Sequence, residues 1–143
     1  MFAQNEILSA VWKKLDADAT LQGTSYLKNS GKIWTGSKRP MQTDNPLLTI
    51  EGSRQLYESQ MEQWQLLIKA YVDEADNGSV DMTRLGNITD RIVDLLHNAE
   101  MTITGGRIRS VYLDSSSEAL YDPQHQKEHH QELTFRMFAI KST

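Results

Sequence analysis

The first regular hydrophobic pattern along the chain predicts an α-helix over about residues 4–18. Leu8, Val11, Trp12 and Leu15 recur at the spacing that places side chains on one face of a helix. Charged residues fall between them and occupy the opposite face. The helix is therefore expected to bury one face against a core.

A second helix is predicted from Asp81, a residue type that caps helix N-termini, to about residue 98. Gly86 lies inside it and costs about 1 kcal/mol relative to alanine. Close packing of the helix against a sheet would account for this glycine. The apolar stripe of the helix consists of Leu85, Ile88, Ile92, Leu95 and Leu96.

Four segments have the features of β-strands. A short one is predicted at 47–52, from β-branched content and a closing glycine, and another strand at 107–115, after a Gly-Gly turn. Residues 63–72 alternate apolar and polar positions, which predicts a long strand with one strongly apolar face. The last strand, 132–141, places one set of apolar side chains on a single face: Leu133, Phe135, Met137 and Ala139.

Residues 21–46 have no sustained periodicity and contain Gly, Ser, Asn and Pro throughout, so we expect a long loop over about 22–46. A short hairpin around Lys32 to Trp34 is one possibility inside it. Loops of this length in compact domains often contact partners. The order of elements predicts an α+β fold: an antiparallel (mixed) β-sheet of about four strands, packed by two helices on one side.

Composition places the chain among folded, soluble proteins. Its 143 residues fit a single domain, 1–143, and 38% are hydrophobic and 24% charged. No uncharged apolar run approaches the roughly 20 residues of a membrane span. The absence of cysteine excludes disulfides, thiolate zinc sites and cysteine nucleophiles.

Charge is distributed unevenly, although the net charge of −4 gives no overall attraction to nucleic acid or to anionic membranes. The long loop has a net charge of +3, from Lys28, Lys32, Lys38 and Arg39 against Asp44. The segment 114–132 is acidic, since Lys127 alone opposes the five residues Asp114, Glu118, Asp122, Glu128 and Glu132.

A cluster of His125, His129 and His130 with Glu128 is the candidate for a metal site, because His-x3-His on a helix presents two imidazoles on one face. No separate motif supplies the remaining ligands. We therefore expect a solvated connector, and a small metal-dependent hydrolase using His125, His129 and Glu128 is the alternative.

Other catalytic motifs are absent. The serine run 115–117 lacks the Gly-x-Ser-x-Gly context of a nucleophile, and the chain has no glycine-rich phosphate loop. We expect no enzymatic activity, no metal and no cofactor.

The basic loop, which also contains Tyr26 and Trp34, permits three interpretations. It can be a solvated loop, an arm that docks on protein, or a module that binds single-stranded nucleic acid by stacking and phosphate attraction. We expect no membrane contact and no specific nucleic acid.

The order of these segments resembles the tail-completion or tail-terminator (tail-to-head joining) proteins of long-tailed bacteriophages. The opening "ILSAVWKKLDADATL" is similar to the family's first helix and its passage into a variable loop, and "NPLLTIEG" to its first strand. "MEQWQLLIKAYVDEADNGSVDMTRLGNITDRIVDLLHN" resembles the family's long strand, turn and helix. "GRIRSVYLDSSSEALYDPQHQKEHHQELTFRMFAI" resembles its later strand, Tyr-Asp-Pro connector and final strand.

This resemblance implies a structural virion protein that forms a homohexameric ring on the finished tail tube. The ring would stop tube growth and offer the surface to which the filled head attaches, at the head-proximal end of the tail, after assembly in the host cytoplasm. The implied partners are the protein itself, the tail tube protein and the head–tail connector or stopper. A head-side connector or stopper, which binds the portal, is the alternative within virion assembly.

A ring needs two different patches on each subunit that meet across the subunit boundary. We expect the basic loop to meet the acidic segment, and reversal of Lys38 and Arg39 to be compensated by reversal at Glu118 or Asp122. The predicted interface residues are Lys28, Lys32, Trp34, Lys38, Arg39, Asp114, Glu118 and Asp122.

Overall fold

Two long central strands form the base of the fold in the computed structural model, which describes residues 1–36, 40, 44–74, 81–121 and 128–142. β3 (Met61–Asp73) and β7 (Glu128–Lys141) pair antiparallel from Met61 opposite Ile140 to Asp73 opposite Glu128. The predicted apolar faces are confirmed, since alternate side chains from both strands are buried: Trp64, Leu66, Ile68, Ala70, Val72, Leu133, Phe135, Met137 and Ala139.

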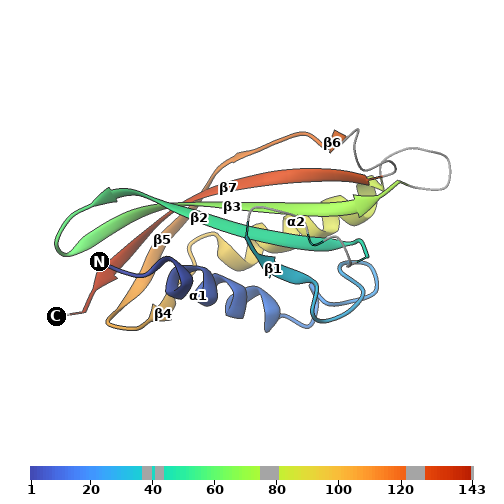
Figure 1. Ribbon diagram of the computed structural model, residues 1–143. Helices are drawn as coiled ribbons and strands as arrows, with labels where there is room; N and C mark the ends of the chain where they lie inside the picture. The colour runs from blue at the N-terminus through green and yellow to red at the C-terminus, as the bar shows by residue number, and fades with distance from the viewer. Residues whose placement is uncertain (37–39, 41–43, 75–80, 122–127, 143) are drawn as a thin grey trace.

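The rest of the sheet is built outward from this pair (Figure 1). Its strand order is β1-β2-β3-β7-β5-β4, and β6 pairs with the remaining part of β7. β1 and β2 run parallel, and the other pairs are antiparallel. The bounds are β1 (Ile33–Thr35), β2 (Leu47–Tyr57), β4 (Met101–Ile103), β5 (Gly106–Ser116) and β6 (Leu120–Tyr121).

The α+β class holds, but the prediction of about four strands is wrong, because the curled sheet has seven strands within the described residues. The four long strands, β2, β3, β5 and β7, are the predicted ones. The other three contain only two or three residues, too few to show a period of two. The hairpin considered at Lys32 to Trp34 is also wrong, since β1 pairs in parallel with β2.

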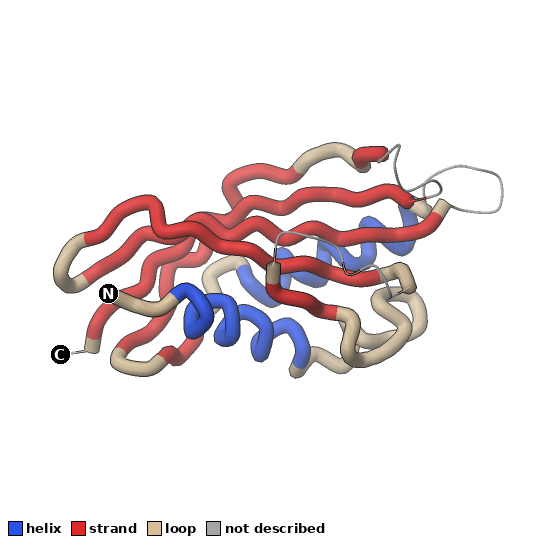
Figure 2. The backbone as a smooth tube through the Cα atoms, in the orientation of Figure 1, coloured by secondary structure: helices blue, strands red, loops and turns tan. Residues whose placement is uncertain are grey.

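Both helices lie on one face of the sheet, as predicted (Figure 2). α1 (Gln4–Asp16) contacts β1 and β2 near one edge of the sheet and β4 at the other. α2 (Met82–Leu96) packs on β3, β5 and β7, and the Asp81 side chain accepts a 3.1 Å hydrogen bond from the Arg84 N–H, which confirms the predicted cap. In the described part of the chain, neither helix is long and apolar enough to cross a membrane.

The explanation offered for Gly86 is wrong. A Cβ added there would meet no atom within 4 Å, so tight packing does not require glycine at this position in α2. Gly106, at the start of β5, is the tightly packed glycine, because a Cβ there would clash with the Ile140 carbonyl and the Phe2 ring.

A buried carboxylate joins the N-terminal segment to the sheet. Glu62 accepts hydrogen bonds from the Phe2 N–H at 2.8 Å, Arg54 Nε at 2.9 Å and Trp64 Nε1 at 3.0 Å. The Arg54 guanidinium also lies 4.7 Å from the Trp64 ring centroid. Burial acts to raise the pKa of Glu62, but the three hydrogen bonds favour the charged form, and the net result is a pKa below the ordinary value.

Glu62→Gln is expected to lower the free energy of unfolding by about 2 kcal/mol at neutral pH, because the buried ion pair with Arg54 is lost. A carboxyl group with a depressed pKa stabilises the fold above its unfolded-state pKa, and this contribution disappears as the pH falls through the folded-state pKa. The stability difference between wild type and variant should therefore shrink below about pH 5. Urea unfolding at several pH values measures it, with the exposed Glu58→Gln as control.

Gly86→Ala is expected to stabilise the protein by about 1 kcal/mol, since the helix gains a better helix former without a steric conflict. Gly106→Ala should destabilise it, because the backbone of β7 and the Phe2 ring would have to move. Thermal unfolding of the two variants checks both signs, and a destabilised Gly86→Ala would contradict the account of α2.

Candidate protein-protein interface

The predicted interface residues that the structure describes form two groups at opposite sides of the sheet. Lys28, Lys32 and Trp34 lie in or next to β1, whereas Asp114 lies in β5 and Glu118 between β5 and β6. Strands β2, β3 and β7 separate the two groups. Three further predicted residues lie outside the described residues: Lys38, Arg39 and Asp122.

The first side, here the β1–β2 edge, is only partly covered by β1. β1 pairs with Leu48 to Ile50 and no further among the described residues. The Leu48 N–H donates to the Lys32 carbonyl and the Ile50 carbonyl accepts from the Gly36 N–H, both at 2.8 Å. Beyond Ile50, β2 continues to Tyr57 with β3 on its other side.

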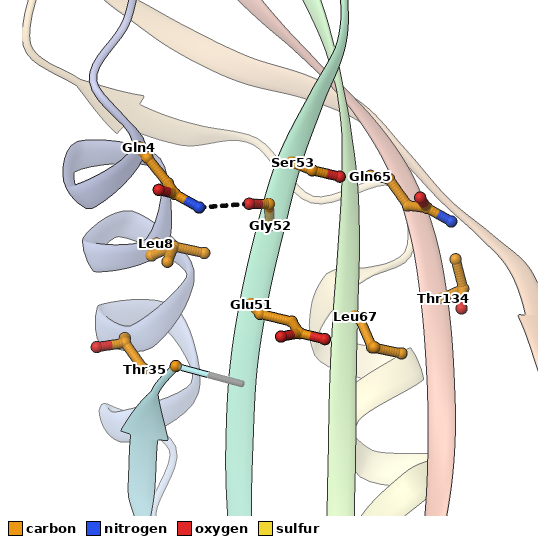
Figure 3. Close-up of a pocket in the computed structure, with 10 residues that line it drawn as sticks. Gln4, Leu8, Thr35, Glu51, Gly52, Ser53, Gln65, Leu67 and Thr134 are labelled. Atoms are coloured by element: carbon orange, nitrogen blue, oxygen red, sulfur yellow. Dashed lines mark hydrogen bonds between the residues drawn. The ribbon is translucent and has the colours of Figure 1, made fainter. Parts of the chain in front are cut away.

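A groove of about 540 Å³ opens where β1 ends (Figure 3). Gln4 of α1 donates a 2.6 Å hydrogen bond to the Gly52 carbonyl, at the position where a continued β1 would lie. Leu8 packs against the same glycine, because a Cβ at Gly52 would lie 3.1 Å from its Cδ2. The groove walls are mainly uncharged: Gln4, Leu8, Thr35, Gly36, Gly52, Ser53, Gln65, Leu67 and Thr134, with Glu51 as the charged residue.

The segment that precedes β1 is held against α2 by side chains of the helix. Arg84 Nη1 donates to the Thr24 and Tyr26 carbonyls at 2.9 and 2.6 Å, and Asn87 donates to the Ser25 carbonyl at 3.2 Å. This part of the predicted loop is therefore ordered, and it positions the exposed Lys28 that follows.

A second attachment lies at the start of the same segment. Arg91 of α2 makes two hydrogen bonds to the Asp18 carboxylate, at 2.7 and 2.9 Å, and Asp18 also accepts from the Leu21 N–H. The hydrogen bond from Arg91 is the main reason why the pKa of Asp18 lies below its usual value. The two helices and the segment between α1 and β1 are thus tied at one point.

The second side, here the β5–β6 edge, runs along β7. β4 covers β5 only from Gly106 to Ile108, and the Asn98 N–H donates to the Val111 carbonyl at 2.8 Å. Ser117 exchanges two 2.9 Å hydrogen bonds with the Glu132 backbone, so β5 and β6 follow β7 as one interrupted strand. Asp114 is about half exposed and 3.8 Å from Arg136, and Glu118 is exposed.

Exposed apolar side chains gather on these two edges. Seven large apolar residues are exposed in the described part of the chain, and five of them lie here, each 40–49% exposed. Of these five, only Trp34 was predicted from the sequence. The exposure of the others depends on strand register, because register decides which part of a strand has no neighbouring strand beside it. On the β1–β2 edge they are Trp34, Leu56 and Tyr57, and on the β5–β6 edge Tyr112 and Leu120.

The histidine-rich stretch is strand rather than connector over its second half. Glu128, His129 and His130 belong to β7, so the helical spacing assumed for a metal site is wrong for His129. His129 Nε2 lies 3.3 Å from Glu74 Oε1, and the His130 ring packs 5.2 Å from the Tyr71 ring. The strand includes these polar residues because β3 extends far enough to pair with them.

Among the described residues, no three His, Asp or Glu side chains are arranged to hold a metal ion. His125, the other residue of the predicted pair, lies outside them. The first two serines of the run 115–117 lie in β5.

Comparison with solved structures finds the same fold elsewhere, although no protein-family model and no curated protein matches the sequence. A chain of the structure titled "Virion of native gene transfer agent (GTA) particle" superposes with a TM-score of 0.71 at 14% identity, covering 99% of this chain and 100% of that chain. A second solved structure superposes with a TM-score of 0.68 at 12% identity, covering 100% and 99%. The chain thus shares its complete fold with a component of a virion particle.

Arg84→Ala is expected to loosen the segment that carries Lys28 while the domain stays folded. Each hydrogen bond from the guanidinium contributes about 1.5 kcal/mol, so amide exchange in 23–31 should become at least about tenfold faster. Hydrogen-exchange mass spectrometry measures this, with Arg107→Ala as control because its ion pair with Glu100 is half exposed. Unchanged exchange in 23–31 would show that other contacts order the segment.

Proposed function

We propose that the protein is a structural component of a phage-like virion that assembles as a ring, a homohexamer, at the head-proximal end of the tail. The ring caps the tail tube, ends its polymerisation and provides the surface for head attachment. The observation that carries this proposal is the match over the whole chain to a chain of a gene transfer agent virion.

The distribution of surface features supports assembly over catalysis. The described residues hold a basic and an acidic group at opposite sides of one sheet, and exposed apolar side chains accompany both. Two unlike surfaces on one subunit are the requirement for a head-to-tail interface that closes into a ring. If the subunits join through their sheet edges, the two flat sides of the ring stay free to contact neighbouring virion proteins.

Electron microscopy of the purified protein mixed with tails that lack their terminator tests the capping role. We expect rings at one end of each tail, tails of uniform length when the protein is present during assembly, and tails that become competent to join heads. Binding to the portal of isolated heads, with no binding to tails, would support the head-side connector instead.

The charges of the two edges are expected to guide subunit association. Lys28→Glu should slow ring assembly about tenfold at low salt, because charge complementarity acts mainly on the association rate. Adding Glu118→Lys to that variant should restore much of the rate. Stopped-flow light scattering measures the effect, and Lys13→Glu on the exposed side of α1 is the matched control. Equal rates for Lys28→Glu and Lys13→Glu would contradict the pairing.

A further inference from the structure

We infer that neighbouring subunits join edge to edge, so that the β-sheet of one copy continues into the sheet of the next. The uncovered part of β2, residues 52–57, would lie beside the β5–β6 edge, residues 112–121, of a second copy of this chain. The inference rests on the proposed ring and specifies how its subunits make contact.

The backbone of β2 has the polarity needed for a further strand. The Leu48 N–H and the Ile50 carbonyl point toward β1, on the outer side of β2. Backbone groups alternate in direction along a strand, so those of Gly52 and Arg54 also point toward the outer side. The Gly52 carbonyl does point outward, since Gln4 reaches it from α1. The register shift between Arg54 and Leu56 interrupts this alternation of outward and inward backbone groups, which resumes near the hairpin between β2 and β3.

The hairpin fixes the orientation of Tyr57. Glu58 and Met61 exchange two backbone hydrogen bonds, at 2.8 and 3.2 Å, as the closing pair of β2 and β3. Tyr57, the residue before Glu58, therefore directs its N–H away from β3, toward the outer side of β2. Outward backbone groups at Gly52, Arg54 and Tyr57 form the row that an incoming strand would pair with.

Four of the five exposed apolar side chains at the two edges share one face of the sheet, and Tyr57, opposite Glu62, lies on the other. Residues directly opposite in paired strands lie on the same face. All four lie on the face that the two described helices leave uncovered (Figure 2). The strand register shows this, since their partners on neighbouring strands lie on that face: Thr49 for Trp34, Gln63 for Leu56, Arg136 for Tyr112 and His130 for Leu120. In a continuous sheet, Leu56 of one copy would adjoin Tyr112 of the next and Trp34 would adjoin Leu120, because the two edges run antiparallel. This contact removes apolar surface from water.

Charge favours a second copy in head-to-tail orientation as the occupant, although Glu51 lines the groove and Lys28 lies near Asp73, Glu74 and Asp81. Lys28 and Lys32 accompany the β1–β2 edge, whereas Asp114 and Glu118 accompany the β5–β6 edge. Pairing of two like edges would bring like charges together, and pairing of unlike edges brings opposite charges together. Repetition of that contact uses the uncovered stretch on each side of every subunit once the ring closes.

The chain contains no cysteine, so pairs of introduced cysteines report on the contact directly. We would treat Leu56→Cys/Tyr112→Cys and Trp34→Cys/Leu120→Cys with a short bismaleimide, which tolerates small differences in register. These are the matched pairs because β5 and β6 run antiparallel to β2, so the edges of neighbouring copies align in opposite directions. Head-to-tail contact predicts covalent ladders beyond the dimer for at least one double variant. Each single variant should remain mostly monomeric on denaturing gels.

Dimers from Leu56→Cys alone, at the yield of the double variants, would show like-edge pairing and overturn the inference. Rings on tails that give no ladder with either double variant would also overturn it, while leaving the capping function intact. Ladders from protein that never caps tails would support the sheet contact and reject the proposed function. Failure to assemble in any form would reject both.

The backbone part of the inference has its own test. Tyr57→Pro removes an N–H that β3 does not use, whereas Tyr57→Ser removes the ring and keeps the N–H. We expect the proline variant to assemble at least about tenfold more weakly than the serine variant, with both retaining the wild-type circular dichroism spectrum. Equal assembly of the two, together with unchanged amide exchange at 52–57 on assembly, would contradict pairing through the backbone.

Discussion

The antiparallel pairing of β3 with β7 is the interaction on which the rest of the structure depends. It joins residues 61–73 to 128–140 in one ladder, across the sequence of α2, β4, β5 and β6. Its apolar side receives both helices, so the core lies there and the opposite face has no helix (Figure 2). Every other strand adds to one side or the other of this pair, which places the N-terminal half of the sheet at one edge and β5 with β6 at the other.

α1 links the two sides of the curled sheet. It touches β1 and β2 on one side of the curled sheet and β4 on the other, and Trp12 donates a 3.0 Å hydrogen bond to the Ile33 carbonyl of β1. The carboxylate of Glu62 fixes the chain that leads into this helix. A ring that closes requires a constant angle between its two contact surfaces. A helix whose buried side packs against β1, β2 and β4 supplies such rigidity, because packed cores resist deformation.

Open sheet edges are a hazard for a protein that has to wait for its partners. Such edges can pair with any strand and lead to aggregation. Here Gln4 occupies the Gly52 carbonyl, charged residues accompany both edges, and neither uncovered stretch is long. These features fit the proposed ring, in which a subunit would stay separate until matching charges bring a second copy into register. No catalytic chemistry is needed for that role, only the position of backbone groups and side chains at two sides of one sheet.

Hydrophobic periodicity by itself determined both helices and the two central strands, β3 and β7, with their buried faces, because each spans enough residues for its period to appear. The strands β2 and β5 were predicted from β-branched content and from neighbouring glycines. The charged segments and Trp34 were likewise visible in the sequence. Only the tertiary structure decided that β1, β4 and β6 exist, that His129 belongs to a strand, and that Leu56, Tyr57, Tyr112 and Leu120 stay exposed. The physical reason is that strands of two or three residues form only when a neighbour offers hydrogen bonds. Exposure, likewise, depends on which strands and helices cover a side chain from distant parts of the chain.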